Sequence, residues 1–188
     1  MESCKKNAIL LPNPITQVAS MPYSLYLSLQ GKYFSGFTGK LTFGNGNNAW
    51  AGLLNPIDSR VNLHLYVWEV LNTGSSPVRA RIYFNSSPPG PKTIVNTVFQ
   101  GNTTLYPPPK PRVKLYQASD VADEPTGGVK VFVRRALPGV TVGDEEVGKF
   151  IFPPGGSFVI FLSNPETPDK PASAVLSFSW WEEKVGCR

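Results

Sequence analysis

Hydrophobic and polar residues alternate with a period of two along most of the chain. Five runs show this pattern, which is typical of strands that bury one face. They cover residues 23–30, 61–68, 79–84, 129–134 and 174–181. In the fourth run, Val129, Val131 and Val133 are the residues expected to face the core. The pattern predicts a protein built mainly from β-strands.

Two further stretches extend this prediction. Residues 158–162 are apolar on both faces, as expected for a strand in the middle of a sandwich or one covered by a neighbouring subunit. Residues 57–73 contain neither Gly nor Pro, so their apolar positions could line a helix or a strand. Their Val, Tyr and Trp content and the better fit to a period of two favour a strand.

Turn-forming segments rich in Gly, Pro and Asn separate the runs. They are residues 44–48, 72–77, 87–91, 107–109, 138–139 and 153–156. Eight to ten strands at this spacing, without amphipathic helices between them, predict an all-β, antiparallel β-sandwich. Long Pro-rich crossings and the lack of a Cys…Trp…Cys spacing favour a jelly-roll-like fold over an immunoglobulin fold.

The composition agrees with a single domain that carries an extended N-terminal arm. The 188 residues include 19 Pro and 17 Gly, a density of helix breakers that excludes coiled coils and helix bundles. Charged residues make up 16% of the chain, against about 25% in typical soluble domains. We expect the arm to cover residues 1–22 and the sandwich domain to cover residues 23–188.

The arm contains several apolar residues between its prolines. These are Ile9, Leu10, Leu11, Ile15 and Val18. Apolar side chains in an extended segment suit packing on the sheet edge or groove of a neighbouring subunit. The alternative is a frayed terminus without a partner.

The N-terminus and the net charge argue against membranes and nucleic acids as partners. The apolar run at residues 8–11 ends at Pro12 and is too short for a secretory signal, and no segment approaches the ~18 apolar residues of a membrane helix. We therefore expect synthesis in the cytosol and no membrane partner. A net charge of +5 without a basic cluster longer than two residues argues against nucleic-acid binding.

The two cysteines, Cys4 and Cys187, lie near opposite ends of the chain. This spacing fits neither a zinc site nor a redox pair. The 18 residues from Cys4 to Pro22 could extend roughly 60 Å at ~3.3 Å per residue. Cys4 could therefore reach Cys187, or another Cys4, of a neighbouring copy, and a disulfide would lock a head-to-tail filament. Free thiols in a reducing cytosol are the alternative.

Few side chains are suited to catalysis. His64 is the only histidine, and it lies in a predicted strand without a nucleophile motif. One histidine and two terminal cysteines cannot build a conventional metal site. Consecutive carboxylates at 144–146 and 182–183 usually mark hairpins or sheet edges. We expect no catalytic residue, metal or cofactor, and the protein is not expected to be an enzyme.

Aromatic residues are the candidates for binding. Trp50, Trp68, Trp180 and Trp181 could stack on sugar rings, or could pack against a second subunit or against long loops. Because several strands are apolar on both faces, we favour subunit packing over ligand stacking.

Several segments resemble an uncharacterised family from spore-forming Firmicutes. They are FGNGNNAW at 43–50, LNP at 54–56, FPPGGSF at 152–158, FLSNPE at 161–166 and WWEE at 180–183. The resemblance spans about residues 30–184 and implies no activity, but it implies a spore-surface setting. In architecture the chain is similar to endospore appendage subunits, which are jelly rolls with a cysteine-bearing N-terminal connector. That similarity implies a connector role for the Cys4 arm.

Together these observations predict a structural subunit that self-assembles into a fibre or surface layer on endospores. Its expected partners are further copies of itself and other spore-surface proteins. The alternative is a carbohydrate- or surface-binding β-sandwich module.

Overall fold

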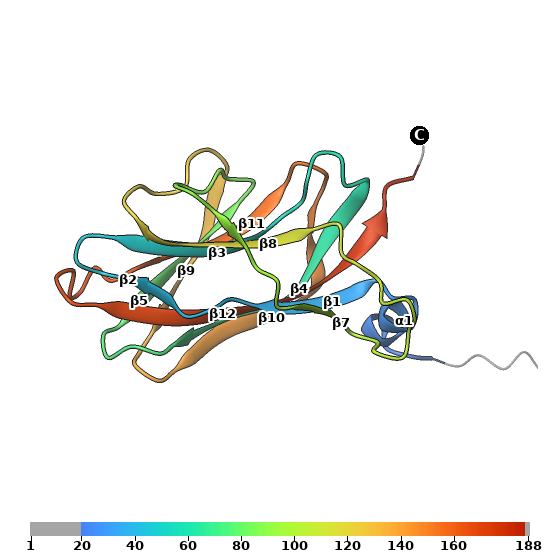
Figure 1. Ribbon diagram of the computed structural model, residues 1–188, viewed down its shortest axis with the longest axis horizontal. Helices are drawn as coiled ribbons and strands as arrows, with labels where there is room; N and C mark the ends of the chain where they lie inside the picture. The colour runs from blue at the N-terminus through green and yellow to red at the C-terminus, as the bar shows by residue number, and fades with distance from the viewer. Residues whose placement is uncertain (1–19, 187–188) are drawn as a thin grey trace, which may run out of the picture.

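The computed structural model describes residues 20–186, which form two antiparallel β-sheets packed face to face, preceded by one short helix (Figure 1). The elements are α1 (Tyr23–Leu29), β1 (Tyr33–Phe37), β2 (Leu41–Phe43), β3 (Asn48–Leu54), β4 (Val61–Asn72), β5 (Val78–Phe84), β6 (Thr93–Ile94), β7 (Val98–Gln100), β8 (Lys114–Val121), β9 (Val129–Ala136), β10 (Thr141–Phe152), β11 (Ser157–Ser163) and β12 (Ala172–Lys184).

Strand order identifies the sandwich as a jelly roll. The first sheet has the order β10-β4-β12-β1-β7, with β2 also paired to β12, and the second has the order β6-β8-β3-β11-β5-β9. Leaving out the short strands β2, β6 and β7 and the flanking strand β8, eight strands remain. If these eight strands are numbered by their order in the chain, their spatial order is 1-8-3-6 in the first sheet and 2-7-4-5 in the second. This is the double Greek key of jelly rolls, so the predicted fold class is confirmed.

The predicted strands are present at 61–68, 79–84, 129–134, 158–162 and 174–181. The ambiguous window at 57–73 is a strand over Val61–Asn72, as its period of two indicated.

The main core lies between the sheets and is built around large rings. Trp68, Trp180, Phe152, Phe158 and Phe178 are all fully buried there. Burying one large apolar side chain contributes about 1.5–3 kcal/mol to folding, so these rings account for much of the cohesion between the two sheets.

A smaller core lies on the outer face of the second sheet. Trp50, Tyr83, Val159 and Phe161 pack there, and Pro89 in the loop after β5 accepts a 2.8 Å hydrogen bond from the Trp50 indole. The double-sided apolar pattern of residues 158–162 is thereby explained, because the chain's own loops cover the second face.

Residues 23–29 form a helix, so the strand predicted at 23–30 is wrong. The segment has no β-branched residue and directly follows Pro22. Gly31, at a φ of +68°, ends the helix. The N–H of Gly31 donates to the carbonyl of Ser28, and the N–H of Lys32 donates to that of Leu27, both at 3.0 Å. These two bonds form a Schellman motif, which terminates helices.

Strand β9 faces the opposite way from the prediction. Val129, Val131 and Val133 are exposed, whereas Phe132 points inward and packs near Phe150 with ring centroids 6.0 Å apart. A ring buries more apolar area than a valine side chain, and β9 is an edge strand with a β-bulge opposite Ile82 and Tyr83. The inward position of the three valines is therefore wrong.

Candidate interaction surface

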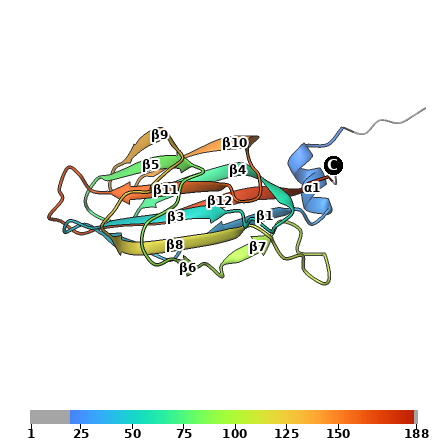
Figure 2. The same ribbon diagram turned by 90° about the horizontal axis from the view of Figure 1, so that it is seen from above.

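Helix α1 leaves most of its apolar side chains in solvent. It lies at one end of the sandwich, beside β1 and the loop after β7 (Figures 1 and 2). Of its seven residues, only Leu27 is buried. Met21, Tyr23, Leu25, Tyr26 and Leu29 are 44–59% exposed, and we call them the helix patch. Grouped apolar exposure of this kind typically marks an interaction site.

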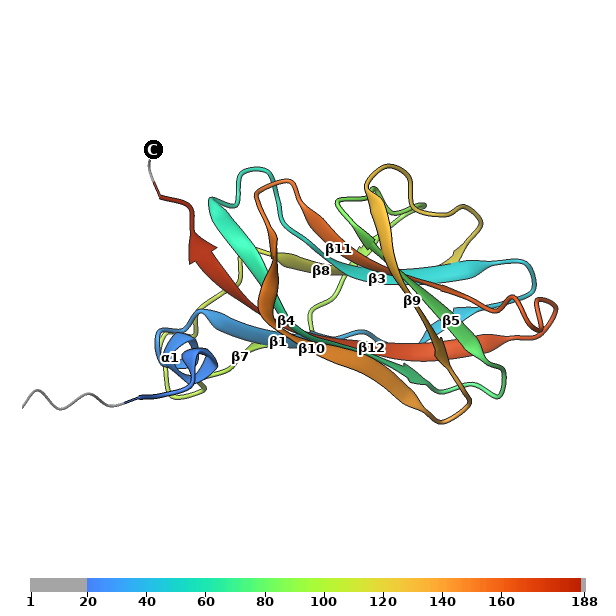
Figure 3. The same cartoon turned by 180° about the vertical axis from the view of Figure 1, so that it is seen from behind.

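A second apolar group lies at the other end of the sandwich. The turn between β9 and β10 is at the end far from α1 (Figures 1 and 3). Leu71, Leu137 and Val140 are 37–45% exposed there, and we call them the turn patch. Apolar surface is thus present at both ends of the domain.

Asn72 holds the turn patch in place. Its buried side-chain amide donates to the carbonyls of Ser76 at 2.8 Å and Ala136 at 3.0 Å, and its Oδ1 accepts from the N–H of Gly74. Its own N–H donates to the carbonyl of Val140. Because these bonds join two turns to the end of β4, the patch has a defined shape.

Trp181 forms the floor beneath α1. Its ring stacks on His64 at 4.9 Å and meets Tyr23 edge-on at 5.7 Å. Gly148, in a bulge of β10, lies so close that an added Cβ would come within 1.5 Å of the Trp181 ring. The helix therefore rests on a preformed aromatic surface.

His64 is held by structural contacts. Its Nε2 lies 3.0 Å from Oε2 of Glu183, and its Nδ1 lies 3.4 Å from the carbonyl of Gly148. No hydroxyl or thiol is among its hydrogen-bond partners in residues 20–186. The arrangement orients the imidazole against Trp181 and offers no nucleophile.

The four tryptophans are buried within the chain, so their interpretation as interface or ligand residues is wrong. The Trp68 indole donates to Glu146 at 3.0 Å and the Trp180 indole to Glu182 at 3.3 Å, both inside the domain. Trp50 packs against a long loop, one of the alternatives the sequence left open. A register shift opposite Ser179 and Trp180 adds one residue to β4 and turns Trp68 inward, and simple alternation cannot reveal it.

Glu182 is a buried carboxylate that fixes a loop. It accepts hydrogen bonds of 2.9–3.0 Å from the N–H groups of Arg112 and Val113. Burial raises the pKa of Glu182 above its usual value, although these donors oppose the shift. The loop between β7 and β8 is thereby pinned to β12.

Glu124 fixes a second loop over the smaller core. Tyr83 donates to it at 2.9 Å, and Arg81 forms an ion pair with it. Burial alone would raise the pKa of Glu124, but the hydrogen bonds from Tyr83 and Arg81 lower it. The pKa of Tyr83 is raised by its own burial and by this contact. The Glu124 side chain is half exposed, and its contacts with Tyr83 and Arg81 tie its loop to β5.

The remaining predicted site residues lie outside the described part of the chain. They are Cys4, Ile9, Leu10, Leu11, Ile15, Val18 and Cys187. Within residues 20–186, no group of three or more His, Cys, Asp or Glu side chains is placed to hold a metal ion. No helix in the same residues has the length and apolar character needed to cross a membrane.

Neither patch was identified from the sequence. Pro22 and Gly31 on either side of residues 23–29 were the available signal for the helix. Leu137 and Val140 flank a Pro-Gly turn, where apolar residues are uncommon, and that placement was the signal for the turn patch.

Comparison with known proteins gives a family without an assigned activity. A model described as "Family of unknown function (DUF6143)" matches residues 7–187. No curated protein and no solved structure matches the chain.

Proposed function

The chain belongs to DUF6143, a family of unknown function, and we propose that it is a structural subunit whose copies associate end to end into a fibre or surface layer. The observation that supports this proposal is the apolar surface at both ends of the sandwich, the helix patch at one end and the turn patch at the other. Grouped apolar side chains on a surface are typical of interaction sites.

The two patches differ in shape and composition, so contact between them is heterologous. The helix patch presents two tyrosines on a helix, and the turn patch presents three aliphatic side chains beside a tight turn. A heterologous contact that does not close into a ring continues as a filament. The position of the patches at opposite ends supports end-to-end growth.

The N-terminal arm supplies a second contact in this proposal. Its apolar residues, Ile9, Leu10, Leu11, Ile15 and Val18, precede the helix patch in the chain. We assign them to the neighbouring copy reached by the helix patch. Cross-linking through Cys4 and Cys187, and location on the endospore surface, belong to the same proposal and rest on the sequence alone.

Electron microscopy and sedimentation velocity of the full chain test this function. We expect filaments or sheets whose formation is strongly reduced by Leu25→Lys and by Val140→Lys. Losing the burial of one such side chain corresponds to about 1.5–3 kcal/mol, or roughly a 10- to 100-fold weaker contact. Lysine keeps the helix propensity of leucine, so α1 remains intact.

Ile57→Lys is the matched control. Ile57 is 80% exposed and belongs to neither patch, so this variant should assemble like the unmodified chain. Circular dichroism verifies that each variant is folded. Dispersed monomers of the unmodified chain at every concentration, or identical assembly of all variants, would contradict the proposal. Reductant then tests the cysteines separately.

A further inference from the structure

Strand β9 leaves one edge of the second sheet open. It is the last strand in the order β6-β8-β3-β11-β5-β9, and within residues 20–186 it pairs only with β5 (Figure 3). Val129, Val131 and Val133 are 37–62% exposed along it. Alternate residues of an edge strand direct their N–H and C=O groups away from the sheet, and a long apolar edge of this kind is a template for adding a strand.

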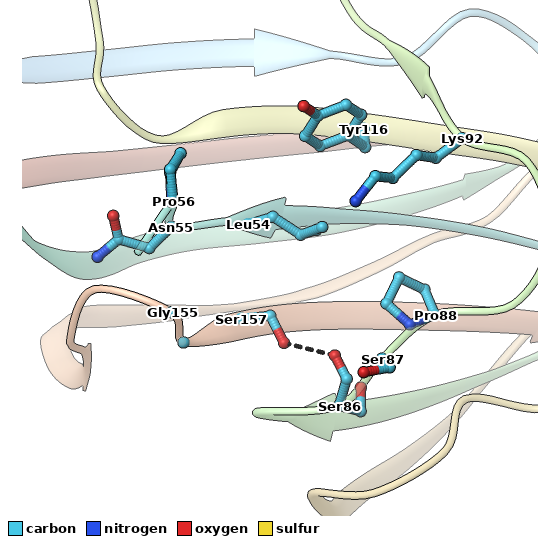
Figure 4. A pocket seen from close by; sticks show the side chains of 11 residues that line it. Leu54, Asn55, Pro56, Ser86, Ser87, Pro88, Lys92, Tyr116, Gly155 and Ser157 are labelled. Carbon is cyan, nitrogen blue, oxygen red and sulfur yellow. Dashed lines mark hydrogen bonds between the residues drawn. The ribbon is translucent and has the colours of Figure 1, made fainter. Parts of the chain in front are cut away.

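The opposite edge of the same sheet is partly closed by the chain itself. In the loop after β5, the carbonyl of Ser86 accepts a 2.9 Å hydrogen bond from the Ser157 hydroxyl, and Lys92 lies 4.8 Å from the centre of the Tyr116 ring (Figure 4). Strand β6 follows this loop and pairs with Tyr116 and Gln117 of β8. The free edge of β9 has no such partner among residues 20–186.

The edges of the first sheet are less suited to an apolar segment. Strand β7 has only three residues, and β10 exposes Asp144 and Glu145 before its bulge. In contrast, β9 contains neither Gly nor Pro, and residues 132–136 keep a regular register with β5 up to the turn patch. The charges of Arg134 and Arg135 are already held in ion pairs within the domain.

The N-terminal arm has a composition that suits this edge. Residues 1–19 lie outside the described part of the chain, and residues 7–19 contain no charged side chain. The five residues nearest α1, ITQVA at 15–19, contain no Pro, and Ile, Thr and Val favour strands. The arm leads into the helix patch, and β9 ends next to the turn patch. End-to-end contact therefore places the arm of one copy beside the end of β9 in the next.

We propose that residues 15–19 of one copy add to the free edge of β9 in the next copy, opposite residues 132–136. Both segments run toward the joint between the copies, so the pairing is parallel. Side chains of alternate arm residues then cover Val133. Pro14, which has no N–H to donate, falls beside the bulge that interrupts β9. This inference rests on the proposed end-to-end assembly and names the surface that receives the arm.

Paired substitutions in the arm of the full chain test strand addition. Two successive N–H groups of a strand point to opposite sides, so Thr16→Pro with Gln17→Pro removes one donor to β9 in any register. Thr16→Ala with Gln17→Ala is the matched control, because it keeps both donors. We expect the critical concentration for assembly, measured by sedimentation, to be about tenfold or more higher for the proline pair than for the alanine pair. Equal critical concentrations would overturn the proposal.

Photo-cross-linking of the assembled chain locates the arm. With benzoylphenylalanine in place of Val18, we expect cross-links to residues 131–136, identified by mass spectrometry of the digested protein. A mixture of isotope-labelled and unlabelled copies should show that these cross-links join different copies. Filaments whose arm cross-links within its own copy, or to another surface, would overturn strand addition alone. An unmodified chain that stays monomeric would overturn both this inference and the proposed assembly.

Discussion

Gly148→Ala tests the packing of the β10 bulge on Trp181. Gly148 has a φ of +75°, and an added Cβ would lie 1.5 Å from a Trp181 ring carbon. The left-handed backbone costs a residue other than glycine about 1–2 kcal/mol, and overpacking a filled site costs about 1–3 kcal/mol. We expect the free energy of unfolding to fall by about 2–5 kcal/mol.

Gly127→Ala separates the two contributions. Gly127 has a φ of +64°, but nothing lies within 4 Å of its added Cβ. We therefore expect the free energy of unfolding of Gly127→Ala to fall only by the cost of the left-handed backbone, about 1–2 kcal/mol. The difference between the variants therefore measures the overlap with Trp181.

Equilibrium unfolding in urea, followed by circular dichroism and tryptophan fluorescence, is the assay. A folded Gly148→Ala protein should also show red-shifted fluorescence, because relief of the overlap moves the Trp181 ring toward solvent. If both variants lose the same stability and the emission does not shift, the bulge does not press on Trp181 and the support assigned to α1 is wrong.

Two further predictions concern buried polar side chains. Asn72→Ala should lower the free energy of unfolding by about 2–4 kcal/mol, because two backbone carbonyls and one N–H lose a buried partner; a loss below about 1 kcal/mol in urea unfolding would contradict this reading. The pKa of Glu182 is raised in the folded state above its ordinary value of 4.5. Its contribution to the free energy of unfolding is therefore greatest when the pH is below 4.5, and it declines as the pH rises through the folded-state pKa. The stability of the unmodified protein relative to Glu182→Gln, from urea unfolding at several pH values, should therefore fall with rising pH, and a constant difference would refute this.

Much of the fold follows from local sequence pattern. Strands at 61–68 and 174–181 alternate clearly, and their outer faces are partly polar, so a period of two identifies them. Turn residues at 44–48 and 153–156 then limit the connections to those of an antiparallel sandwich. The order of the strands in the jelly roll agrees with these connections.

The errors arise where a feature depends on distant residues. Residues 23–29 alternate as a strand would, but no neighbouring strand pairs with them, and the Schellman motif at Gly31 favours a helix. The inward position of Trp68 depends on an extra residue in β4, which is visible only in the pairing of β4 with β12.

The pairing of β1 with β12 also affects how the domain carries mechanical load. The two strands are antiparallel neighbours, with Tyr33 opposite Trp181, so the described chain enters and leaves the sandwich at the same end (Figure 2). A force that pulls on both termini of one copy would peel β1 from β12 and break these hydrogen bonds one after another. In a fibre held through the helix end of one copy and the turn end of the next, tension runs along the strands. The hydrogen bonds between the strands are then loaded together in shear, and this geometry resists force better than peeling from one end.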